Sequence, residues 1–298
     1  MKILLTGATG FIGRPLLNRL LEKFGSESIM VISSKQIAGV QCAIYKSHRD
    51  LNLERYDFTD VTVLIHAGAF TQKSSSDLDA IDKCNDNILF TEQLFRLSMP
   101  NLKKVIYLST IDVYEECDVV SERSNLRPAT LYGASKLYCE QMSRAFARNK
   151  QIESLVLRIG HVYGPGEEKY KKMLPQTIQK VIAGEQIEIW GDGSELRSFI
   201  YIDDVVRAIA SAIGATTGVG EINIVSSTPI TISELVREIV GLGSKRVQVI
   251  FQDVIYTKRN WVFDNSLMRQ HLLSSEIGLD EGLRREFDYM ERLVERNI

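Results

Sequence analysis

The sequence has little of what marks an exported, membrane-spanning or nucleic-acid-binding protein. Its 298 residues include only four cysteines, Cys42, Cys84, Cys117 and Cys139, with no CxxC pair and no histidine at a metal-ligand spacing. No stretch approaches the roughly 20 apolar residues that cross a bilayer, and the apolar run after Met1 is too short for a signal peptide. The formal net charge is −2, and Lys and Arg form no block. We therefore expect a cytoplasmic protein with reduced thiols and no metal site, and neither nucleic acid nor a membrane as its partner.

The first half of the chain alternates short apolar runs with segments of helical periodicity. Buried strands are predicted at residues 2–5, 29–32, 61–66, 104–108 and 154–157, and helices at 77–98 and 134–149. A further helix follows the first strand, because residues 16, 17, 20, 21 and 24 share one apolar face, and Gly25 is expected to end it. Strands that alternate with helices predict a parallel sheet covered on both faces, a Rossmann-type doubly wound α/β fold.

The pattern changes after about residue 163. Helices are predicted at 170–183, 203–213, 232–240 and 281–296, separated by short strands at 187–190 and 221–225. We expect a dinucleotide-binding domain at residues 1–163 and a smaller mixed α/β substrate-binding portion at 164–298, and the chain can cross between them more than once. The smaller portion would close over the carboxyl ends of the strands, where open parallel sheets bind ligands.

A glycine motif follows the first strand and opens the first helix. Gly7 would allow the tight turn, Gly10 would let the backbone approach a pyrophosphate, and Gly13 would let the helix pack on the strand. The helix N-terminus would then receive the phosphate charge. This pattern predicts a bound nicotinamide dinucleotide.

The end of the second predicted strand bears on which dinucleotide binds. An acidic residue there would bind the ribose 2′-hydroxyl of NAD, whereas a cation would bind the 2′-phosphate of NADP. The sequence has Ser33, Ser34 and Lys35 and no acid nearby, which favours NADP over NAD. A lysine in a solvated loop would explain Lys35 equally well.

A tyrosine and a lysine lie four residues apart in the helix predicted near residue 134. Lys136 would lie one turn after Tyr132, and its ammonium is expected to lower the pKa of the phenol toward neutrality. Upstream, Ser109 and Thr110 close a strand, where a hydroxyl could hold a substrate oxygen. This arrangement predicts acid–base chemistry at Tyr132.

Further motifs accompany these segments: TGATGFIG at 6–13, HAGA at 66–69, Asn87 before Thr91, Ser109-Thr110 with Val113-Tyr114, Tyr132-xxx-Lys136, R-xx-HVYGPG at 158–166 and GDG-xxx-RSFIYIDD at 191–204. Together they resemble the extended short-chain dehydrogenase/reductases, the NAD-dependent epimerase/dehydratase family that acts on nucleotide sugars, across almost the whole chain. The resemblance implies that Thr110, Tyr132 and Lys136 are catalytic, and that Arg197 meets the nucleotide or diphosphate of the substrate. Together with the glycine motif and the end of the second strand, it gives a set of expected dinucleotide contacts at Gly7, Thr9, Gly10, Phe11, Ile12, Gly13, Ser33, Ser34, Lys35, Ala67, Gly68, Tyr132 and Lys136. The expected substrate contacts are Asp112, His161, Arg197 and Arg259.

Three residues depart from the family pattern. The family's 4,6-dehydratases carry Asp and then Glu after the threonine, but this chain has Ile111 and Asp112, and Ile111 cannot move a proton. Dehydration is therefore disfavoured. Asp112 stands where some decarboxylases of the family carry Glu, which leaves that chemistry open, although a solvated or capping carboxylate explains Asp112 as well. His161 replaces the usual Asn and resembles the family's nucleotide-sugar 4-ketoreductases, such as CDP-abequose synthase.

Three functions fit these residues. The first is reduction of a nucleotide-linked 4-keto-6-deoxy sugar. Tyr132 would protonate the sugar oxygen, while Lys136 tunes the tyrosine and Thr110 orients the oxygen. The second is 4-epimerisation on a retained NAD with the same three residues. The third is a non-catalytic dinucleotide-binding module, which the joint presence of the three residues disfavours.

The resemblance also implies a homodimer that pairs through the two long helices. The apolar stripe of that interface could be formed by Leu137, Met142, Phe146, Phe90 and Leu94, although the same residues could instead belong to the core.

Overall fold

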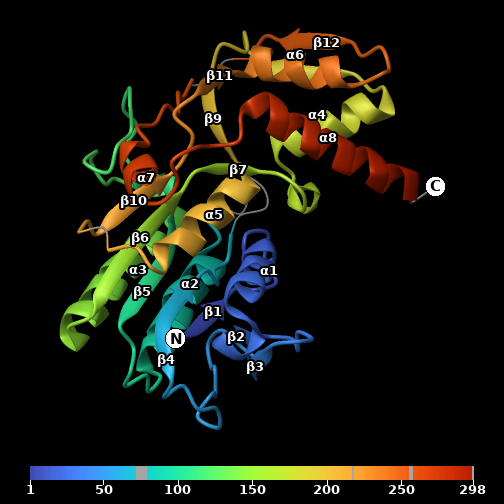
Figure 1. Ribbon diagram of the computed structural model, residues 1–298. Helices are drawn as coiled ribbons and strands as arrows, with labels where there is room; N and C mark the ends of the chain where they lie inside the picture. The colour runs from blue at the N-terminus through green and yellow to red at the C-terminus, as the bar shows by residue number, and fades with distance from the viewer. Residues whose placement is uncertain (72–78, 217, 255–257, 297–298) are drawn as a thin grey trace.

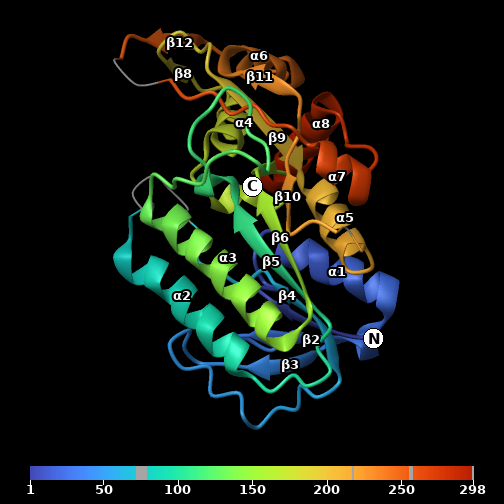
Figure 2. The same cartoon turned by 90° about the vertical axis from the view of Figure 1, so that its left-hand side faces the viewer.

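The computed structural model describes residues 1–71, 79–216, 218–254 and 258–296 (Figure 1). A seven-stranded parallel sheet lies at its centre and has helices on both faces, which confirms the predicted doubly wound α/β fold. Helices α2 (Ile81–Arg96) and α3 (Leu131–Lys150) lie side by side on one face, and α1 (Gly13–Phe24) and α5 (Ile202–Ala212) cover the other (Figure 2). The strand order is β10 (Glu221–Ile224), β6 (Glu153–Ile159), β5 (Lys104–Thr110), β4 (Val61–His66), β1 (Lys2–Thr6), β2 (Ile29–Ser33) and β3 (Gln41–Ile44).

The predicted strands of the first half are all present, and two helix boundaries differ. Helix α3 begins at Leu131 and not at residue 134, because the Thr130 hydroxyl accepts a hydrogen bond from the Gly133 N–H at 3.1 Å and caps the helix. Tyr132 therefore lies in the first turn. Helix α2 is shorter than predicted, and residues 77 and 78 of that prediction lie outside the described residues.

The second half of the chain forms two small sheets and a group of packed helices. Strands β11 (Pro229–Thr231), β9 (Leu196–Tyr201) and β7 (His161–Tyr163) form one sheet, and β8 (Ile187–Trp190) pairs with β12 (Val249–Gln252) in the other. Helices α4 (Met173–Ala183), α6 (Ile232–Leu242) and α8 (Leu279–Arg296) pack on each other at the top of Figure 1, and α7 (Ser266–His271) lies against β10. Because α5 and β10 return to the central sheet after residue 163, the chain crosses between the two parts; the division at residue 163 stays a prediction.

The largest hydrophobic core runs without a break from the central sheet into the second half. It includes Leu5 and Leu16 near the glycine motif, Ile209 of α5, and Ile178 and Leu283 of the upper helices. A second core fills the other face of the sheet, beneath α2. The walls of any site between the two halves are therefore held by one packed interior.

Buried carboxyl groups interrupt this interior beside α8. Glu286 is fully buried, and neither of its carboxyl oxygens has a hydrogen-bond partner among the described residues. Burial raises the pKa of Glu286 to about 8, with Glu167 and Glu168 adding to the shift, and burial raises the pKa of Glu167 to about 7. A carboxyl whose pKa is raised on folding stabilises the protein most below its unfolded value of about 4.3, and that stability is lost as the pH rises through the folded value.

We therefore expect Glu286→Gln to raise Tm at about pH 9, with a difference from the wild type that shrinks toward about pH 5. The measurement is thermal unfolding as a function of pH. Glu291→Gln is the matched control, because Glu291 is exposed on the same helix, and its Tm should follow the wild type. A Glu286→Gln variant that is less stable than the wild type at every pH would contradict the expectation.

Candidate active site

A cavity of about 480 Å³ opens at the carboxyl ends of the central strands. The glycine loop after β1, the ends of β4 and β5, the first turns of α3 and the start of β7 all line it. This is the edge of the sheet where the fold predicts a ligand, and the volume suits a small molecule. Of the residues predicted to bind ligands, the cavity is lined by Gly7, Thr9, Gly10, Phe11, Ile12, Gly13, Ser34, Ala67, Gly68, Thr110, Asp112, Tyr132, Lys136 and His161.

The glycine loop is fixed against the end of β4. Gly7 has a φ of +76°, and a Cβ there would lie 2.7 Å from the backbone of Ala67, while a Cβ on Gly13 would collide with the Gly7 carbonyl. The Thr6 hydroxyl accepts a hydrogen bond from the Gly68 N–H at 2.8 Å and is bonded to His66 Nδ1, also at 2.8 Å. These contacts hold the loop and the Ala67-Gly68 turn on one side of the cavity, with the N-terminus of α1 beside them.

Gly10 differs from its two partners in the motif. A Cβ on Gly10 would meet only the Gly7 carbonyl oxygen within 4 Å, at 3.3 Å, and the residue faces the cavity. Its carbonyl accepts from the Arg14 N–H at 3.0 Å as α1 begins. The residues thus fit a dinucleotide, since the loop is open where a pyrophosphate would approach and ends in a helix N-terminus.

The end of β2 contributes Ser34 to the cavity, whereas Ser33 and Lys35 lie outside its lining. The Ser33 hydroxyl is buried and accepts a hydrogen bond from the Lys35 N–H at 3.1 Å, and Lys35 is exposed. Tyr45 and His48 line the cavity near Ser34, and the Tyr45 hydroxyl is bonded to His48 Nε2 at 2.7 Å. No motif or periodicity pointed to these two residues, because they follow β3, a strand that the hydrophobic pattern did not reveal.

Thr110, Tyr132 and Lys136 all line the cavity. Thr110 ends β5 and begins the 3₁₀ turn η3 (Ile111–Val113), and its hydroxyl donates to Asp112 Oδ2 at 3.0 Å. Tyr132 is buried and lines the same cavity as Thr110. Lys136 Nζ donates to the Leu108 carbonyl at 2.6 Å and lies 4.5 Å from the centroid of the Tyr107 ring.

The expected lowering of the Tyr132 pKa is wrong for this structure. Burial raises the pKa of Tyr132 well above its ordinary value, and the carboxylate of Asp112 raises it further. Burial also lowers the pKa of Lys136 to about 8, and its ammonium is bonded to the Leu108 carbonyl. The direction differs because the sequence shows a lysine one turn away but shows neither the burial of the phenol nor the neighbouring carboxylate.

His161 lines the cavity as a neutral side chain. Burial lowers the pKa of His161 to about 3, and the charges of Arg197 and Lys172 lower it further. Its Nδ1 is shielded from solvent and has no hydrogen-bond partner among the described residues, while its ring lies near Phe199 and Trp261.

The two arginines expected to contact the substrate do not line the cavity. Arg197 donates to the Glu195 carboxylate at 2.7 Å and to the Leu196 and Arg259 carbonyls. Arg259 lies 3.7 Å from the Glu116 carboxylate. Their substrate roles stay predictions.

Lys172 does line the cavity. It was not predicted, because no sequence motif marks it.

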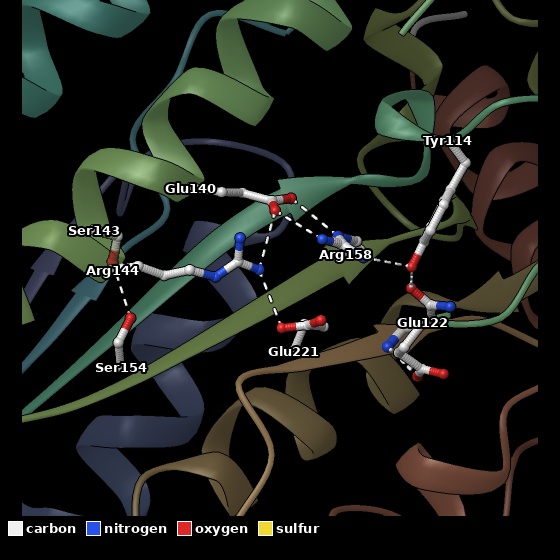
Figure 3. Close-up of polar contacts among 9 residues, drawn as sticks. Tyr114, Glu122, Glu140, Ser143, Arg144, Ser154, Arg158 and Glu221 are labelled. Atoms are coloured by element: carbon white, nitrogen blue, oxygen red, sulfur yellow. Dashed lines mark hydrogen bonds and ion pairs between the residues drawn. The ribbon is translucent and has the colours of Figure 1, made fainter. Parts of the chain in front are cut away.

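A buried polar network joins α3 to the sheet and to the turn after Thr110 (Figure 3). Glu140, one turn after Lys136 on α3, receives two hydrogen bonds from Arg158 of β6, at 3.0 and 2.8 Å. Arg158 also donates to the Tyr114 hydroxyl at 2.7 Å, and Tyr114 donates to Asn223 of β10 at the same distance. The bidentate pair fixes the position of α3, and with it the position of Tyr132, relative to η3.

Two classes of site are absent from the part of the chain that the structure describes. No group of His, Cys, Asp or Glu side chains there could hold a metal ion. No helix among those residues is long and apolar enough to cross a membrane.

The fold and the cavity together define a dinucleotide-binding α/β protein with a Tyr–Lys pair in its site. The sequence profile of the NAD dependent epimerase/dehydratase family matches residues 3–224. The chain belongs to this family, which confirms the resemblance seen in its motifs.

Individual members of the family can be compared with this chain. A dTDP-D-glucose 4,6-dehydratase from Dictyostelium discoideum is 29% identical over 235 residues, which cover 70% of this chain and 54% of the relative. A dTDP-4-dehydro-6-deoxyglucose reductase from Escherichia coli is 27% identical over 279 residues, covering 87% of each chain. The chain spans about half the length of several of the curated relatives it matches.

Two solved structures share the fold over nearly the whole chain. MoeE5 in complex with UDP-glucose and NAD has a TM-score of 0.84 and 26% identity, and the match covers 99% of this chain and 100% of MoeE5. A UDP-glucuronic acid 4-epimerase from Bacillus cereus in complex with UDP-4-deoxy-4-fluoro-glucuronic acid and NAD has a TM-score of 0.83 and 27% identity, covering 98% and 100%.

Proposed function

We propose that the protein reduces the 4-keto group of a nucleotide-linked 4-keto-6-deoxyhexose, with NADPH as the preferred reductant. The observation that carries the proposal is that one cavity holds the glycine loop and Thr110, Tyr132 and Lys136, with the aliphatic Ile111 after Thr110. A bound dinucleotide supplies the hydride. Tyr132 then gives its proton to the sugar oxygen, and the Thr110 hydroxyl orients that oxygen.

Ile111 bears on the choice between reduction and loss of water. It lines the cavity next to Thr110 and cannot take or give a proton, so this chain lacks a proton-transfer group at that position. The neutral ring of His161 can hydrogen-bond a sugar hydroxyl without adding charge. The similarity to the Escherichia coli reductase supports the same reaction class.

A 4-epimerase with retained NAD is the second candidate. It would use the same three residues, first to oxidise the sugar and then to reduce it on the opposite face. The observation that favours it is the structural likeness to a 4-epimerase solved with NAD. Tight NAD that co-purifies with the protein would support this candidate, whereas a site that NADPH saturates would support the reductase.

The test is turnover of two sugar nucleotides by the purified protein. We expect NADPH to be consumed when dTDP-4-keto-6-deoxyglucose is added, with one equivalent of a reduced sugar formed. UDP-glucose, which has no keto group, should cause no consumption. Conversion of UDP-glucose to its 4-epimer without added cofactor would replace the reductase by the epimerase, and no reaction with either would refute both.

Cofactor preference gives a separate prediction. NADPH is expected to bind at least about tenfold more tightly than NADH, because one charge-assisted contact contributes roughly 1.5–3 kcal/mol. Lys35→Glu should reverse that order by placing a carboxylate beside the 2′-phosphate. The measurement is a set of dissociation constants for both cofactors, with Lys23→Glu, an exposed lysine outside the cavity lining, as the control. Tighter NADH binding by the wild type would overturn the NADP preference.

We also propose a cytoplasmic homodimer that pairs through the outer faces of α2 and α3. Phe90 and Leu94 cannot form its apolar stripe, since both are buried in the core beneath α2, and Phe146 stacks on Phe95 with ring centroids 4.4 Å apart. The exposed Tyr138 on α3 is a better candidate. Light scattering at micromolar concentration should give a dimer, and Tyr138→Glu should dissociate it; a wild-type monomer would refute the proposal.

A further inference from the structure

A series of buried hydrogen bonds runs from the turn after β4 toward the helix that carries Tyr132. At its start the Gly68 N–H donates to the Thr6 hydroxyl at 2.8 Å, and the same hydroxyl is bonded to His66 Nδ1 at 2.8 Å. On the other side of the ring, His66 Nε2 lies 3.0 Å from the Thr91 hydroxyl of α2. The side chains of Thr6, His66 and Thr91 are buried, so these bonds are shielded from solvent.

The direction of these bonds fixes the tautomer of His66. The Thr91 hydroxyl donates its single proton to the Asn87 carbonyl at 2.8 Å, so toward His66 it must accept from an Nε2–H. A neutral imidazole carries one N–H, which leaves Nδ1 to accept from the Thr6 hydroxyl. Burial lowers the pKa of His66 to about 3, and the Lys136 ammonium lowers it further, which keeps the ring neutral.

The series continues from Asn87 to the first turn of α3. The Asn87 side chain accepts from the Phe70 N–H at 2.6 Å and donates through Nδ2 to the Ser135 hydroxyl at 3.3 Å. The Ser135 hydroxyl donates in turn to the Tyr132 carbonyl at 2.8 Å. The bonds therefore connect the turn beside the glycine loop with the start of α3, by way of α2, which lies next to α3 (Figure 2).

His66 can act on the site only through its neighbours. Gly68, Asn87 and Tyr132 line the cavity, whereas His66 does not. Its ring also packs against the rings of Phe90 and Tyr107, with 5.4 Å between centroids in each case. A residue that only filled this space would be replaced well by phenylalanine, whereas a residue that makes two directed hydrogen bonds would not.

We propose that His66 is a positioning residue that holds the Ala67-Gly68 turn and the first turn of α3 at a fixed separation. Its Nδ1 accepts from β1 and its Nε2–H donates to α2, so each side of the ring fixes one wall of the cavity. The inference rests on the proposed function, in which Tyr132 must reach the sugar oxygen while the sugar carbon faces the bound dinucleotide. A misplacement of about 1 Å between two such groups can cost about 100-fold in rate.

The first experiment compares three replacements of His66 by turnover and thermal unfolding, with NADPH and dTDP-4-keto-6-deoxyglucose, or with UDP-glucose if epimerisation is found. His66→Phe keeps a ring and removes both bonds, so kcat should fall at least about tenfold while the KM for the cofactor changes little. His66→Gln can place an N–H near the position of Nε2, and His66→Asn an oxygen near that of Nδ1, so each should recover part of kcat. His66→Phe should nevertheless have the highest Tm of the three. A kcat that is also highest in His66→Phe would show that His66 only fills space and would overturn the proposal.

Thr91→Val interrupts the series without changing the ring, and Thr177→Val is its matched control. Both threonines are buried on a helix, and each hydroxyl donates to the carbonyl four residues earlier at 2.8 Å. Both variants lose that bond, but only Thr91→Val also leaves His66 Nε2–H without its acceptor. We expect kcat to fall about tenfold in Thr91→Val and to stay near the wild type in Thr177→Val, which lies outside the cavity lining. Equal kcat in the two variants would contradict the proposal.

The second experiment needs no substrate, so it separates failure of the inference from failure of the proposed function. Nitrogen NMR of labelled histidine, with the His66 signals assigned from His66→Gln, reports which ring nitrogen carries the proton. We expect a proton on Nε2 alone, with no titration near neutrality, where free histidine titrates. A wild-type ring protonated at Nδ1 would reverse the bonds and refute the proposal.

Hydrogen exchange then tests the connection itself. ADP carries a diphosphate for the glycine loop, which packs on the Ala67-Gly68 turn, but has neither the second ribose nor the nicotinamide of the cofactor. We expect ADP to slow amide exchange at residues 133–136 in the wild type and to slow it much less in His66→Phe. Equal slowing in both proteins, or none in the wild type, would overturn the proposal whether or not either sugar nucleotide is turned over.

Discussion

Tyr132→Phe is expected to lower turnover by at least about 100-fold and to leave dinucleotide affinity unchanged. The substitution removes only the hydroxyl, so the buried ring still packs at the start of α3 and the capping bond from Gly133 to Thr130 is untouched. What is lost is the proposed proton donor at the sugar oxygen. The measurements are steady-state turnover and a fluorescence titration with the reduced cofactor.

Tyr138→Phe is the matched control for this variant. Tyr138 lies on the same helix, is 56% exposed and does not line the cavity, so its hydroxyl should not matter for turnover. Near-wild-type activity in Tyr132→Phe would remove the catalytic assignment. A matching loss of cofactor affinity would mean that the phenol binds the dinucleotide and that its role in proton transfer must be shown separately.

The central sheet could be predicted because its strands are buried on both faces. All residues of β2 and β5 are buried, and each strand contains an uninterrupted apolar run, at 29–32 and at 105–108. Strands β3 and β12 were missed because they are only four residues long and partly exposed, and the three apolar residues of each make too short a run to predict a strand. Strands β7, β9 and β11 of the three-stranded sheet were not predicted either. Their pairing is decided by the sheet that they join and not by their own residues.

The site was predictable where its residues adjoin a strand end or a glycine turn. Thr110 ends β5, Ala67 and Gly68 follow β4, and the three glycines follow β1, so position along the sheet sufficed. Other lining residues, Tyr45 and Lys172 among them, come from segments whose placement depends on tertiary packing. The direction of the Tyr132 pKa shift likewise depends on burial and on the orientation of Asp112, which residue spacing does not reveal.

Gly10→Val should abolish dinucleotide binding while the protein remains folded. Of the three glycines in the motif, Gly10 is the one whose added Cβ would meet only a single protein atom, the Gly7 oxygen at 3.3 Å, and it faces the cavity where a pyrophosphate would approach. A branched side chain there fills ligand space with little disturbance of the fold.

Gly13→Ala is the matched comparison, since its Cβ would collide with the Gly7 backbone and should destabilise the protein itself. Cofactor titration and thermal unfolding of both variants separate the two effects. Unchanged affinity in Gly10→Val would make the motif a packing element, and a loss of Tm as large as that of Gly13→Ala would show that its space belongs to the fold and not to the cofactor.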